Sequence, residues 1–133
     1  MCGSAKIKGS KACFGTVIAV DTKAGSQRLS WGIGSVTNAR MERLNSVWSP
    51  IQNNRCIMSV DSFYEGSARF ANKSGEMLHL AGVFHKSKFV TLTQPSEGAV
   101  KEVHNRMPVF VNPDKYLSGN TACISNVSLV KVK

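Results

Sequence analysis

The sequence predicts a single α+β domain that is mainly β, built as a curved antiparallel sheet or partly closed barrel with two or three short helices. Three observations favour this class. The chain has 133 residues, which suits one domain with its own core. Short β-branched and aromatic runs outnumber helical patterns, and the connections between them have hairpin length. No internal repeat or linker divides residues 1–133.

The N-terminal part of the chain predicts a β-hairpin. FGTVIAVD (14–21) contains the continuous apolar run of a buried strand, and QRLSWGIGS (27–35) supplies its partner. Between them, TKAGS (22–26) has the composition of a turn.

The central part predicts one helix and one long strand. Apolar residues recur at helical spacing across 38–47, after Thr37 or Asn38 as a cap, so this segment is expected to be a short helix. Residues 49–55 are expected to form a loop. Residues 56–66 begin as a buried strand and end in a dense group of polar and aromatic residues.

The second half alternates strands with short helical patterns. A hairpin is predicted over 68–84, with its turn at 72–75, followed by the β-branched strand 88–94. The remaining predicted elements are helix 96–104 with Ser96 as its cap, strand 107–112, helical turn 113–119 and strand 122–133.

The charge balance favours a polyanionic partner. Seventeen Lys and Arg residues against eight Asp and Glu residues give a net charge of +9. A small domain this basic most often binds nucleic acid, although charge alone also fits a basic surface that binds nothing. The basic residues are spread along the chain, so nucleic acid would meet a folded surface rather than a tail.

The cysteines indicate neither a metal site nor export. Cys2, Cys13, Cys56 and Cys123 have no metal-ligand spacing. The first residues have no long apolar run, so we expect no secretory signal and no membrane span. We therefore expect reduced thiols in the cytoplasm, near the nucleoid or in a host cell if the protein is viral. No cofactor and no metal are expected, and the protein is expected to be a monomer.

Cys2 becomes the N-terminal residue once Met1 is removed, and then carries a thiol and an α-amine on adjacent carbons. The amine titrates near ~8 and the thiol near ~8.5. Such a 1,2-aminothiol condenses with an aldehyde through its amine and closes a five-membered thiazolidine through its sulfur. On position alone, a frayed terminus without a function is the simpler interpretation.

Three other side chains could support such chemistry. Glu65 ends a predicted strand beside two aromatic residues, an environment that suits a general acid. His104 ends a predicted helix, and Asn38 begins one. Each also has an ordinary structural explanation, respectively a surface carboxylate, a partner of a helix C-terminus and a helix cap.

Four residues are candidates for contact with nucleic acid. Arg40 and Arg106 each offer a planar fork to a phosphate, with a surface ion pair as the ordinary alternative. Trp31 lies between a serine and a glycine, which favours an exposed strand end where a base can stack, although a core Trp is commoner. By alternation, one of Phe63 and Tyr64 faces the core and the other the site.

The order of these motifs resembles a known family. The chain contains, in order, MCG, WG, NAR followed by Glu42, RC with DSFYE, AG followed by a hydrophobic pair, TLT and HNRMPV. This set spans about Cys2 to Val109 and resembles the SRAP family, the SOS-response-associated peptidase domains that shield abasic sites in single-stranded DNA. Two positions depart from the family pattern, since Gly66 replaces an aromatic residue and Asn105 replaces an aspartate.

The resemblance implies a role for each candidate. Cys2 is the residue that links to DNA after Met1 is lost, and Asn38 positions it. Glu65 and His104 are the acid and base groups around the sugar. The remaining candidates are expected to contact DNA: Trp31, Arg40, Tyr64 and Arg106.

The resulting hypothesis is a Cys-dependent cross-linking protein with lyase-like or autopeptidase-like activity on single-stranded DNA that contains abasic sites. An abasic deoxyribose is mostly a closed hemiacetal, so a proton donor and acceptor must open it to the aldehyde. The Cys2 amine then forms an imine and the thiol closes the thiazolidine, favoured by the proximity of the reactants. Met1 must leave first, by autocatalysis or through an aminopeptidase.

Two alternatives remain open. A non-covalent single-strand-binding module that has lost the chemistry would keep the basic surface and retain Met1. A thiol peptidase would use Cys2 with His104 and Asn38 or Glu65, but no sequence element indicates an oxyanion hole.

Overall fold

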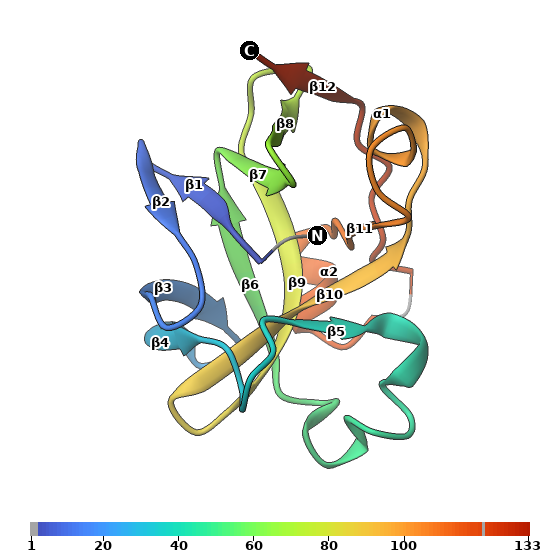
Figure 1. The fold of residues 1–133 in the computed structure, drawn as a ribbon. Helices are drawn as coiled ribbons and strands as arrows, with labels where there is room; N and C mark the ends of the chain where they lie inside the picture. Colours follow the sequence, from blue (N-terminus) through green and yellow to red (C-terminus); the bar gives the residue numbers. More distant parts are fainter. Residues whose placement is uncertain (1–2, 121) are drawn as a thin grey trace.

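The computed structural model describes residues 3–120 and 122–133, which form two sheets with short helical elements packed around them (Figure 1). Cys2 therefore lies outside the described residues. The predicted class is confirmed, because the fold is mainly β and its curved sheets are partly ring-like.

The elements are short. The strands are β1 (Ala5–Ile7), β2 (Ser10–Ala12), β3 (Val17–Thr22), β4 (Gly25–Trp31), β5 (Asn38–Arg40), β6 (Arg55–Val60), β7 (Ser62–Glu65), β8 (Ala68–Asn72), β9 (Leu78–His85), β10 (Lys88–Pro95), β11 (Arg106–Pro108) and β12 (Leu129–Val132). The helical elements are α1 (Gly98–Lys101), α2 (Pro113–Leu117) and the 3₁₀ turns η1 (Met41–Arg43) and η2 (Ser49–Ile51).

The larger sheet closes into a ring. Its strand order is β10-β4-β3-β6-β9, and β9 pairs with β10 again. β5 and β11 also lie along β10, so this strand pairs with four others and crosses the width of the molecule (Figure 1). β4 and β5 run parallel to β10, which differs from the purely antiparallel sheet predicted.

The smaller sheet is antiparallel and has the order β12-β8-β7-β1-β2. The strand predicted over 56–66 is divided at Asp61, where the chain passes from β6 in the larger sheet to β7 in the smaller one. Phe63 on β7 and Phe70 on β8 are fully buried and stack with ring centroids 5.7 Å apart. Burial of these rings holds the smaller sheet against the core.

The helix predicted over 38–47 is wrong. Asn38–Arg40 form β5, in register with Thr91–Thr93 of β10, and η1 follows directly. Ala39 is buried by this pairing, while Met41 and Leu44 pack against the core from turns. Tertiary pairing of a buried strand outweighs the weak helix propensity of the segment.

The prediction that the two strands within 68–84 pair with each other as a hairpin is also wrong. The turn is present, since the N–H of Gly75 donates to the carbonyl of Asn72 at 2.9 Å. β8 pairs with β7 and β12, however, whereas β9 pairs with β6 and β10. Local alternation indicates strands but does not identify their partners.

Other elements agree with the prediction, some in shortened form. The hairpin of β3 and β4, strand β10 and helical turn α2 are confirmed. Helix 96–104 is reduced to α1, and Ser96 does not cap it, because the N-cap is Glu97 and the Ser96 hydroxyl donates to the His104 carbonyl instead. The last two predicted strands are reduced to β11 and β12.

Candidate active site at the amino terminus

The backbone at Gly3 lies directly against the segment that carries Asn38. Gly3 has a φ of +73°, and a Cβ at this position would collide with Oγ1 of Thr37. A left-handed backbone that abuts a side chain accepts only glycine without strain. The residue that follows Cys2 is thus fixed beside the neighbour of Asn38.

The next residue, Ser4, ties the same segment to the strand that carries Glu65. Its carbonyl accepts a hydrogen bond from the N–H of Tyr64 at 3.0 Å, at the end of β7. The chain that leads to Cys2 therefore passes between two segments that the sequence assigns to the site. Cys2 itself is outside the described residues.

Asn38 is held by β10. The hydroxyl of Thr91 donates to Oδ1 of Asn38 at 2.8 Å, across the parallel pairing of β5 with β10. Thr91 is fully buried, so this hydrogen bond is shielded from water. The bond fixes which atom of the Asn38 amide faces β10.

Glu65 and His104 come together although they lie far apart in the sequence. Oε2 of Glu65 is 3.6 Å from Nδ1 of His104. The Glu65 side chain is 0% exposed, whereas that of His104 is 41% exposed. The histidine can therefore exchange protons with water directly. The buried carboxyl group can exchange protons with water by way of this histidine.

The backbone of Arg106 offers Nδ1 of His104 both a donor and an acceptor. The N–H of Arg106 lies 3.1 Å from Nδ1 and donates to it when the nitrogen carries a lone pair. The carbonyl of Arg106 lies 3.2 Å away and accepts when the nitrogen carries a proton. Either tautomer of the imidazole therefore has a backbone partner at Nδ1.

The Arg106 side chain forms a clamp with two residues. Its Nη1 and Nη2 donate to the two carboxylate oxygens of Glu42 at 2.7 and 2.8 Å. Nη2 also donates to the carbonyl of Thr93 at 2.8 Å. The hydrogen bonds from Arg106 lower the pKa of Glu42 from 4.5 to about 2. The Arg106 guanidinium, predicted from the sequence to hold a phosphate, therefore already binds a carboxylate.

The predicted stacking position of Trp31 is wrong. Trp31 is 0% exposed and stacks on Phe89, with ring centroids 6.3 Å apart. Its indole N–H donates to the carbonyl of Thr37 at 3.1 Å. The parallel pairing of β4 with β10 draws Trp31 into the core, where it supports the residue before Asn38 instead of facing DNA.

The other predicted DNA contacts lie at the surface or near it. Arg40 is exposed at the end of β5. Phe63 faces the core, as one of the two was predicted to do, and Tyr64 is half-buried on the other side of β7. The Nζ of Lys11 lies 5.0 Å from the centre of the Tyr64 ring.

Sequence reasoning missed the supporting threonines and gave Glu42 no role. Phe89, Thr91 and Thr93 alternate along β10, so all three face the same side of the sheet. The TLT motif thus directs two buried hydroxyls toward Asn38 and Arg106. Polar residues at alternate positions of an apolar strand were the available signal.

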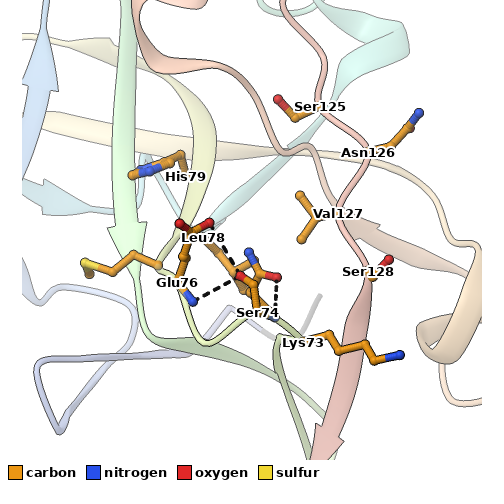
Figure 2. A pocket seen from close by; sticks show the side chains of 11 residues that line it. Lys73, Ser74, Glu76, Leu78, His79, Ser125, Asn126, Val127 and Ser128 are labelled. Carbon is orange, nitrogen blue, oxygen red and sulfur yellow. Dashed lines mark hydrogen bonds between the residues drawn. The ribbon is translucent and has the colours of Figure 1, made fainter.

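A polar groove lies elsewhere, between the turn after β8 and the segment before β12 (Figure 2). Its volume is about 750 Å³, and His79, Ser125 and Asn126 are among the side chains that line it. The His79 ring is hydrogen bonded to Ser59 at 2.8 Å, which is a cross-strand pair of β9 and β6. None of the predicted site residues lines this groove.

Among the described residues, no group of three or more His, Cys, Asp and Glu side chains is arranged to hold a metal ion. Of the cysteines, Cys56 and Cys123 are buried and Cys13 is exposed, and none of the three forms a disulfide. Burial raises the pKa of the Cys56 thiol, so this residue is a poor nucleophile.

The family model that matches this chain is that of the SOS response associated peptidases (SRAP), over residues 12–119. The chain belongs to the SRAP family. The matched range includes Asn38, Glu65, His104 and Arg106 and begins after Cys2. No curated protein matches the chain.

Solved structures share the SRAP-like fold. A protein from Bordetella bronchiseptica has a TM-score of 0.73 at 17% identity, over 98% of this chain and 90% of that chain. A phage-related protein from the same organism has a TM-score of 0.67 at 17% identity, over 92% and 81%. A protein from Bacteroides thetaiotaomicron has a TM-score of 0.64 at 14% identity, over 90% and 75%.

SRAP membership connects the chain with the response to DNA damage and with a peptidase-like activity. It also suggests an interaction with DNA. In the described part of the chain, no helix has the length and apolar character needed to cross a membrane.

Proposed function

We propose that this protein binds single-stranded DNA and, after removal of Met1, captures abasic sites through a thiazolidine formed by Cys2. The observation that carries the proposal is the path of Gly3 and Ser4, which pass beside the segments of Asn38 and Glu65. This path supports the proposal, because the mechanism requires the N-terminal aminothiol to reach the group that would open the sugar.

The proposed reaction begins at the closed sugar. His104 and Glu65 relay the proton that the ring opening requires, with His104 exchanging protons with water. The Cys2 amine adds to the aldehyde carbon and water leaves, which forms an imine. The thiolate of Cys2 then adds to the imine carbon while the imine nitrogen takes up a proton, and this closes the thiazolidine.

The supporting residues have distinct proposed tasks. Asn38, oriented by Thr91, positions the N-terminal cysteine and the opened sugar. Arg40 holds a phosphate from its exposed position. Arg106 holds His104 through its backbone, so its proposed task changes from phosphate binding to positioning.

Intact mass spectrometry tests the proposal. The protein is weighed before and after incubation with an oligonucleotide that contains one abasic site. We expect a mass without Met1, followed by a gain equal to the oligonucleotide minus one water. The variant Cys2→Ser lacks the thiol but retains the amine and should give no heat-stable adduct. A mature protein that forms no adduct, or a Cys2→Ser variant that forms one of equal stability, would exclude the mechanism.

A further inference from the structure

The smaller sheet presents a basic face to the outside. Opposed residues in an antiparallel pair share a face, as do residues two apart on one strand. The registers of β2, β1, β7 and β8 therefore place five side chains on the outer side of the sheet: the exposed Lys11, the half-buried Lys6, Tyr64 and Arg69, and Ser62, which is fully buried. Phe63 and Phe70 occupy the opposite face and are buried. We call this outer surface the basic face.

The charge on the basic face has one sign. Three of the four basic residues in the five strands of the smaller sheet, Lys6, Lys11 and Arg69, lie on the basic face, whereas Lys131 is opposite Phe70 and lies on the other face. The one acidic residue in these strands, Glu65, points inward and is fully buried. No carboxylate from these strands therefore lies on the basic face to neutralise its cations.

Neutral groups hold two of the cations in place. Lys11 lies over the ring of Tyr64, with Nζ 5.0 Å from the ring centre. Nη1 of Arg69 donates to the hydroxyl of Ser62 at 3.0 Å. Neither residue has a carboxylate within ion-pair distance in the described part of the chain. Their charges are thus oriented and remain available to an external anion.

The basic face adjoins the proposed reaction site. Tyr64 lies on it, while the next residue, Glu65, points to the interior. The N–H of Tyr64 also holds Ser4, which leads to Cys2. Four adjacent strands extend about 14 Å across the sheet, which allows contact with more than one phosphate of an extended strand. The position and the charge together favour a polyanion that continues from the amino terminus.

Resting on the proposed function, we propose that the basic face binds the phosphate backbone of the single-stranded DNA flank that leaves the captured site. Lys6, Lys11 and Arg69 contact the phosphates, and Tyr64 orients Lys11. This binding is independent of base sequence, as suits a lesion that arises anywhere.

The test compares two triple variants with the same loss of charge. The first is Lys6→Gln, Lys11→Gln and Arg69→Gln. The control is Lys23→Gln, Arg28→Gln and Lys88→Gln, exposed positions on the larger sheet and its turn. Each is made with Cys2→Ser, and affinity for oligothymidylate without abasic sites is measured as a function of salt. Thermal denaturation checks that both variants are folded.

We expect the first variant to lower the slope of log K against log salt by roughly 2, because each phosphate contact on a single strand contributes about 0.7. The control should change the slope by less than half as much. Equal slopes in the two variants would overturn the basic face as the DNA track.

Capture is then measured in protein that retains Cys2, with a short and a long abasic oligonucleotide. The first variant should react normally with the short one and lose at least about tenfold in rate with the long one at low concentration. If the first variant binds DNA without abasic sites more weakly, but no variant captures an abasic site, the basic face is supported and the thiazolidine mechanism is rejected. Failure of the basic face is therefore distinguishable from failure of the proposed function.

Discussion

Glu42 and Arg106 form a two-pronged ion pair across 64 positions of sequence, with N–O distances of 2.7 and 2.8 Å. The pair joins η1 to β11, and the backbone of the same arginine holds Nδ1 of His104. Arg106 side-chain exposure is 11%, so the guanidinium is largely enclosed. We infer that this clamp sets the position of His104.

The first prediction concerns stability and pH. The folded state lowers the pKa of Glu42 from 4.5 to about 2, so its contribution is fully present above pH 4.5 and is lost as pH falls toward 2. Because Glu42 is 51% exposed, the contribution at neutral pH should be below about 1 kcal/mol. Thermal denaturation should show Glu42→Gln less stable than wild type at pH 6, with the difference shrinking between pH 4.5 and 2. A difference that grows with acidity would contradict the assignment.

The second prediction concerns capture by the same variant. Glu42→Gln should slow adduct formation and change its pH profile, because His104 loses the support of a fixed Arg106. Affinity for undamaged single strands should rise only as much as expected from one removed negative charge. Glu76→Gln, an exposed change of equal charge on the turn before β9, is the control. If Arg106 binds phosphate directly, Glu42→Gln should instead tighten DNA binding well beyond the control and leave the pH profile unchanged.

The third prediction uses two glycines with similar backbones. Gly3 and Gly9 have φ values of +73° and +82°, so alanine is strained at both. Only at Gly3 does the new Cβ meet Thr37; at Gly9 nothing lies within 4 Å. Gly3→Ala should therefore slow capture by roughly 100-fold through misplacement of the amino terminus. Gly9→Ala should lose stability alone, and equal rates in the two variants would argue against a fixed path for residue 3.

The fourth prediction isolates the ring-opening step. Glu65→Gln should slow capture of a normal abasic site by roughly 100-fold, since a general acid or base is lost. An oligonucleotide whose aldehyde cannot close into a hemiacetal should restore most of the rate. Quenched time courses on both substrates measure this, with thermal denaturation as the check on folding. An equal defect on the two substrates would place Glu65 in a later step.

The fifth prediction concerns Trp31. Since its ring is buried against Phe89, DNA should not stack on it. In a Trp48→Phe background, the fluorescence of Trp31 should stay unchanged when single-stranded DNA binds. Strong quenching at saturating DNA would restore the stacking role.

The strands that the sequence predicts best are those with continuous apolar or β-branched character. The hairpin of β3 and β4 and the strand β10 are evident for this reason. The segment 38–47 is not, because its helical spacing is local, whereas β5 exists only through pairing with residues 91–93. The partners of β8 are likewise set by burial of Phe70 against Phe63, which no local pattern contains.

The candidate site likewise contains residues that the sequence predicts and contacts that it does not. The residue types point to Glu65 and His104, and the fold brings their side chains to 3.6 Å. The occupied fork of Arg106 could not be foreseen, because Glu42 approaches only once η1 and β11 both lie along β10. The prediction for Trp31 was wrong because its polar neighbours in sequence do not surround it in space.

The pairing of β10 with four other strands has a consequence for the time at which Met1 can be removed. Thr91, Thr93 and His104 are synthesised long after the amino terminus has left the ribosome. An aminopeptidase would meet Met1 on an unfolded nascent chain, before any of these residues exists. Autocatalytic removal would instead wait for the finished barrel. Under the proposed mechanism, the length of the nascent chain at which Met1 is removed distinguishes the two routes.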